Sequence, residues 1–103
     1  MLFESLKGTK LKKELGAVRV SKSYHNKHKL GSGNFGFIVA YKNNHPKPLD
    51  EFWFRLDGSY NSDGKLVSLS FGSYGGGASR GLQDFTYTEL ISHMKRYVKH
   101  EMN

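Results

Sequence analysis

Alternation of apolar and polar side chains runs through the middle of this chain and constrains its fold more than any other feature. Segments 17–24, 51–56 and 66–71 place an apolar residue at almost every second position. A period of two puts the apolar side chains on one face of a β-strand and the polar ones on the other. Segment 35–42 is apolar at nearly every position, which is typical of a central strand covered on both faces. These segments predict about four strands in an antiparallel sheet.

Gly, Asn, Asp, Ser and Pro collect between the predicted strands, as expected for turns. The predicted connections are residues 25–34, 43–48, 57–64 and 73–81. Segments 51–56 and 66–71 follow one another across one such connection, so we expect them to form a hairpin. The side chains expected to face the core from this hairpin are Phe52, Phe54, Leu56, Val67, Leu69 and Phe71.

A helix is predicted at each end of the chain. The N-terminal segment has apolar residues on helix-like spacings, interrupted at Gly8 and ended at Gly16. Those residues are Leu2, Phe3, Leu6, Leu11 and Leu15. Near the C-terminus, Thr86 and Glu89 have the spacing of a capping box, which predicts a helix running to about His100. Its apolar face consists of Tyr87, Leu90, Ile91, Met94 and Val98.

The element order predicts an α+β fold. We expect an antiparallel sheet of about four strands, with a short N-terminal helix and a longer C-terminal helix packed on it. A chain of 103 residues has the length of one domain, so residues 1–103 are interpreted as a single basic α+β domain. The sequence does not indicate an oligomeric state.

The composition limits the cellular compartment in which we expect the protein and the kinds of site that it can form. The chain has no Cys, which excludes disulfides and thiolate metal sites. Residues 1–13 lack the apolar run of a signal peptide, and no apolar stretch approaches membrane-spanning length. We therefore expect a cytoplasmic protein with no membrane partner.

Positive charge is concentrated in one stretch. The formal net charge is +7, and the segment between Leu15 and Leu49 holds six cations and no acid. Clustered cations attract polyanions through counterion release. The pattern favours nucleic acid or an acidic protein surface as partner, with a solvated surface that promotes solubility as the alternative.

Two sets of candidate binding residues follow from this charge and from one aromatic residue. The candidate nucleic-acid or anion-binding residues are Arg19, Lys22, Lys27, Lys29, Arg80, Lys95, Arg96 and Lys99. Reversing the charge of Lys22, Lys27 and Lys29 together is expected to remove most nucleic-acid binding. Trp53 and Arg55 alternate with the predicted core residues, so Trp53 either packs under the N-terminal helix or is displayed as a partner anchor, with Arg55 beside it.

Residues 34–38, with the sequence Asn-Phe-Gly-Phe-Ile, are similar to the RNA-binding box of RRM and cold-shock domains. That resemblance implies that Phe35 and Phe37 stack on bases from an open strand face. The apolar character of the whole segment favours core packing for both rings instead. We expect the core role.

Catalytic and metal-binding patterns are incomplete in this sequence. The five histidines have no spacing that selects an acid–base pair, and no set of residues has zinc-site or calcium-loop spacing. The chain is therefore predicted to be non-enzymatic, without cofactor or metal. Our first hypothesis is a small basic module that contacts nucleic-acid phosphates. The alternative is a small interaction modulator or inhibitor of a larger protein, for example a nucleic-acid-processing one, and a small ribonuclease ranks behind both.

Overall fold

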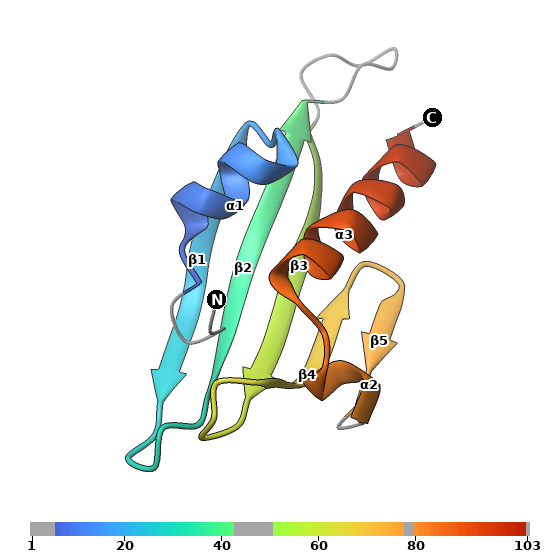
Figure 1. The fold of residues 1–103 in the computed structure, drawn as a ribbon. Coiled ribbons are helices and arrows are strands. Elements are labelled where there is room, and N and C mark those ends of the chain that lie inside the picture. Colours follow the sequence, from blue (N-terminus) through green and yellow to red (C-terminus); the bar gives the residue numbers. More distant parts are fainter. Residues whose placement is uncertain (1–5, 43–50, 78–79, 103) are drawn as a thin grey trace.

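An antiparallel sheet with helices on one face organises the protein, in a computed structural model that describes residues 6–42, 51–77 and 80–102 (Figure 1). The strands, neighbouring one another in chain order, are β1 (Arg19–Lys27), β2 (Gly33–Lys42), β3 (Glu51–Tyr60), β4 (Leu66–Phe71) and β5 (Tyr74–Gly76). The helices are α1 (Gly8–Leu15), α2 (Arg80–Gln83) and α3 (Tyr87–Met102). This architecture confirms the predicted α+β fold. The sheet has five strands, because β5 lies inside the segment predicted to be a glycine-rich connection.

The turns between strands are shorter than the sequence indicates. His25 to Lys27 belong to β1, and residues 57–60 belong to β3, although both segments were expected to be loops. Strands can hold these polar side chains because one face of the sheet is open. Their backbone N–H and C=O groups pair with the neighbouring strand regardless of the type of side chain. In the turn after β3, the Asn61 side chain accepts hydrogen bonds from the backbone N–H groups of Asp63 and Lys65, both at 3.0 Å.

The core lies between the helices and the facing side of the sheet. Phe35 is 1% exposed and Phe37 is fully buried, so both aromatic rings of segment 34–38 are core residues and not a stacking platform. The helices cover one face of β2 only, and Ile38 on its other face is half-buried. On that other face Ala40 is nevertheless fully buried, so the expectation of a strand covered on both faces holds at Ala40 although no described helix packs there. The residues of α1 and α3 that complete the core are Leu11, Leu15, Leu90, Ile91, Met94 and Val98.

Capping residues set the ends of both longer helices. Gly16 has a φ of 67°, the left-handed conformation that ends α1. At the start of α3 the Glu89 N–H donates to Thr86 Oγ1 at 3.1 Å, and the Thr86 N–H donates to Glu89 Oε1 at 3.3 Å. These two bonds confirm the predicted capping box. The first helix begins at Gly8, later than predicted, and residues 1–5 lie outside the described residues.

An irregularity in the pairing of β3 with β4 changes one predicted core position. The register shifts between Ser59 and Tyr60, so that Tyr60 pairs with Leu66. Leu66 is consequently buried and Val67 only half-buried, which corrects the prediction that Val67 points inward. Leu69 and Phe71 are buried as predicted. The connection predicted at residues 43–48 lies outside the described residues.

Candidate functional site

Positive side chains gather on the outer surface of the two longer helices. Because the apolar residues of α1 and α3 face the sheet, the residues between them in sequence point to solvent. The exposed cations of the two helices are Lys10, Lys12, Lys13, Lys95, Arg96 and Lys99, and the exposed acids are Glu14, Glu89 and Glu101. We call this outer surface of α1 and α3 the helical face. In Figure 1 the two helices lie on the same side of the sheet.

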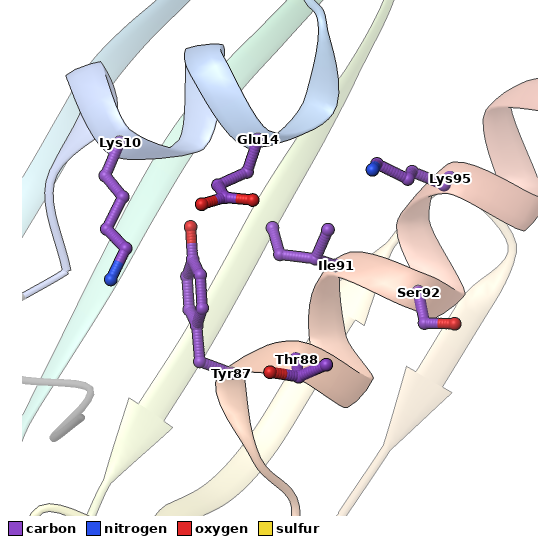
Figure 2. Close-up of a pocket in the computed structure, with 7 residues that line it drawn as sticks. All are labelled: Lys10, Glu14, Tyr87, Thr88, Ile91, Ser92 and Lys95. Carbon is purple, nitrogen blue, oxygen red and sulfur yellow. The ribbon is translucent and has the colours of Figure 1, made fainter.

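A pocket of about 440 Å³ lies between α1 and α3. Figure 2 shows Lys10 and Glu14 entering it from α1, and Tyr87, Ile91 and Lys95 entering it from α3. The Lys10 Nζ atom lies 4.7 Å from the centroid of the Tyr87 ring, a cation–π contact. Two lysines from distant parts of the sequence therefore line one cavity.

The Tyr87 hydroxyl points toward the Glu14 carboxylate of α1 (Figure 2). It is buried, and among the described residues it has no hydrogen-bond partner. Burial, with a smaller contribution from the negative charge of Glu14, raises the pKa of Tyr87 to about 12. The hydroxyl thus keeps its proton at neutral pH.

The predicted β1 cations divide between the two sides of the sheet. Lys22 pairs with Phe37, and its Nζ atom lies 5.9 Å from the Phe37 ring centroid, on the helix side. Lys27 pairs with Gly33 and lies on that side too, whereas Arg19 pairs with Ala40 on the opposite side. Cross-strand register therefore separates Arg19 from the other two. Lys29 is exposed in the turn that follows β1.

Sequence reasoning missed the three exposed cations of α1. Lys10, Lys12 and Lys13 flank the inward residues Leu11 and Leu15, so their helical positions already indicated an outward orientation. The predicted α3 residues Lys95, Arg96 and Lys99 are exposed, as a phosphate-binding role requires. The side chain of Arg80 lies outside the described residues.

Comparison of the chain with models of protein families, with curated proteins and with solved structures finds no match. Function must therefore be inferred from the chemistry of the protein's surfaces.

The side of the sheet opposite the helices, which we call the open face, displays Trp53. This side chain is 58% exposed, and its cross-strand neighbour is Ala40, which in turn pairs with Arg19. The N-terminal helix lies on the other side, so Trp53 is displayed and not packed beneath it. The exposed Arg55 lies on the same face as Trp53, two residues along β3.

Arg55 on the open face is paired with a neighbouring acid. Arg55 Nη2 lies 3.3 Å from Asp57 Oδ1, and the Tyr24 hydroxyl donates to the same oxygen at 2.9 Å. Burial and then the hydrogen bond to Asp57 raise the pKa of Tyr24. A Cβ at Gly36 would lie 2.2 Å from the Tyr24 ring, so glycine is required where that ring crosses β2. The local Arg–Asp pairing makes this face a weaker attractor of polyanions than the helical face.

The described histidines are divided among β1, the first turn and α3, where His93 and His100 line one groove. His25, predicted to be an exposed loop residue, is half-buried on β1 with Nε2 2.7 Å from the Tyr60 hydroxyl. His93 contacts aromatic rings beside α3, and His28 is exposed in the first turn. Within the part of the chain that the structure describes, no three His, Asp or Glu side chains gather where a metal ion could bind. In the same part, no helix combines the length and apolar character needed to cross a bilayer.

Proposed function

We propose that this protein is a non-enzymatic nucleic-acid-binding module that contacts phosphates through its helical face. The observation that supports this most strongly is the pocket between α1 and α3, which Lys10 lines from one helix and Lys95 from the other. Ammonium groups suit phosphate oxygens in both charge and hydrogen bonding. The carboxylate of Glu14 lines the same pocket, so the site carries one negative charge beside the two positive charges of the lysines.

An extended polyanion suits this surface better than a single small anion. The exposed cations of α1 and α3 spread along both helices, and Lys22 and Lys27 continue the positive charge on the same side of the sheet. Each cation that neutralises a phosphate releases a condensed counterion, which favours binding without reading the base sequence. We therefore expect micromolar or weaker affinity for generic duplex at low salt.

The test compares two double variants of equal charge. Lys10→Glu/Lys95→Glu reverses the two lysines that line the pocket, whereas Lys42→Glu/Lys65→Glu reverses two exposed lysines away from the helices. Each double variant lowers the net charge from +7 to +3. Losing two phosphate contacts at low salt should weaken duplex binding on the order of a hundredfold, by the linear relation between log affinity and log salt concentration. Fluorescence anisotropy with a labelled duplex measures both affinities.

Circular dichroism of both variants checks that each remains folded. The proposal requires the matched control to bind far more tightly than the Lys10/Lys95 variant. Equal weakening of the two variants would mean that net charge alone attracts the duplex, and the helical face would lose its assigned role.

A second candidate function rests on the exposure of Trp53. A displayed Trp next to an Arg has the composition of an interaction anchor, and Arg55 lies two residues away on the same face. A protein modulator or inhibitor would use this anchor on the open face. Trp53→Ala separates the two candidates, since it should abolish capture of such a partner and leave duplex binding unchanged.

A further inference from the structure

A second groove lies on the other flank of α3, between that helix and the β4–β5 hairpin. Its volume is about 420 Å³, within the size range of small-ligand sites. Phe71 and Tyr97 contribute aromatic rings to its lining, and Tyr74 and His93 contribute two more from opposite sides. Neither the proposed phosphate contacts nor the open face uses these residues.

The aromatic rings of this groove are held in defined contacts. Tyr74 stacks on Phe71 with ring centroids 4.8 Å apart and planes 15° from parallel. Tyr97 packs edge-on against Phe71 at 5.9 Å, and the His93 ring lies 5.9 Å from Tyr74. The turn at Gly72 packs tightly against this cluster. A Cβ at this position would lie only 2.1 Å from the Tyr97 ring, so only glycine fits there. Gly72 has a φ of 53°, so the tight turn also depends on glycine for its backbone conformation.

Arg96 and the lysines of α3 connect this groove to the helical face. Arg96 and His100 line the groove and lie one helical turn apart on α3. Lys95 and Lys99 form the adjacent row, and Lys95 lines the pocket on the other flank of the helix. A nucleic-acid strand whose phosphates lie along the outside of α3 therefore reaches the aromatic groove while its phosphates remain close to these positive side chains.

We propose that this groove stacks an unpaired nucleobase of a strand whose phosphates lie on the helical face, an inference that rests on the proposed function. Aromatic rings stack on any base, and the neighbouring Arg96 suits the phosphate that accompanies it. A base within a duplex is already stacked and does not enter such a groove. The protein therefore prefers duplexes that carry a single-stranded tail to blunt ones.

The experiment compares a blunt duplex with the same duplex carrying a thymidine tail, by anisotropy at one salt concentration. Wild-type protein should bind the tailed duplex roughly tenfold more tightly, the effect of one stacked base. Tyr74→Ala should bring the ratio of the two affinities close to one and leave blunt-duplex binding unchanged. Tyr74→Phe, which retains the ring, should preserve the ratio. If Tyr74→Ala does not fold, His93→Ala takes its place with the same expected loss of ratio.

Each outcome separates this inference from the function on which it rests. Tight binding of the blunt duplex with no preference for the tail would overturn the groove proposal and leave the helical face intact. A preference that survives both alanine variants would also overturn it. Failure to bind either duplex at low salt would refute the proposed function itself, and the groove proposal with it.

Discussion

A fourfold rise in salt concentration should weaken duplex binding about a thousandfold. The helix side of the sheet presents Lys22 and Lys27 together with the exposed cations of α1 and α3. If about six of these contact phosphates, log affinity falls with log salt at a slope of roughly −5, because each contact releases close to one counterion. Anisotropy titrations at several salt concentrations measure this slope directly.

The slope also identifies which lysines make contacts. Lys10→Glu/Lys95→Glu should reduce it by about two, one for each phosphate contact removed. Lys42→Glu/Lys65→Glu should leave it unchanged. A wild-type slope near zero would show that phosphate contacts do not drive binding, whatever the affinity.

Truncation of Phe37 should have the largest effect on stability among single substitutions in β2. Phe37 is fully buried, and the first turn of α1 lies close to it, with a Cβ built at Gly8 only 3.7 Å from its ring. Phe37→Ala removes that ring and leaves a cavity, which costs about 3–5 kcal/mol in comparable cores. A domain of this size is stable by only about 5–15 kcal/mol, so the variant should be marginally folded. Urea denaturation followed by circular dichroism measures the loss in the free energy of unfolding.

Trp53→Ala is the matched aromatic truncation on the neighbouring strand. Trp53 is 58% exposed, and its removal should lower the free energy of unfolding by about 1 kcal/mol or less. The difference between the two variants in the free energy of unfolding shows which face of the sheet packs against the core. If Phe37→Ala were as stable as Trp53→Ala, the ring would not be a core residue, and the base-stacking role implied by the resemblance of residues 34–38 would regain support.

Local signals predicted α3 and the first four strands to within a few residues, whereas the short helix α2 and the strand β5 were not predicted. The capping box of Thr86 and Glu89 is complete within four positions, and the structure contains it as expected. β5 was missed because Tyr74–Gly76 is three residues long and rich in glycine, with no apolar period. Its strand conformation comes from pairing with residues 69–71, a contact that the segment's own sequence does not reveal.

The candidate sites also depend on contacts that the local sequence does not reveal. Alternation in β3 placed Trp53 opposite Phe52 and Phe54, but its exposure depends on which face the helices cover. Likewise, the spacing of Leu11 and Leu15 indicates that Lys10 points outward, yet its place in one pocket with Lys95 requires α1 and α3 to pack side by side. Surface residues brought together by tertiary packing are not readable from a single sequence.

The most direct test of the helical face is amide chemical-shift mapping during titration with a blunt duplex at low salt. We predict that the largest shifts fall in α1 and in the part of α3 from Tyr87 to Lys99, while the indole signal of Trp53, the only Trp in the chain, stays in place. Shifts centred on Trp53 and Arg55, with α1 and α3 unperturbed, would contradict the account and transfer the binding role to the open face.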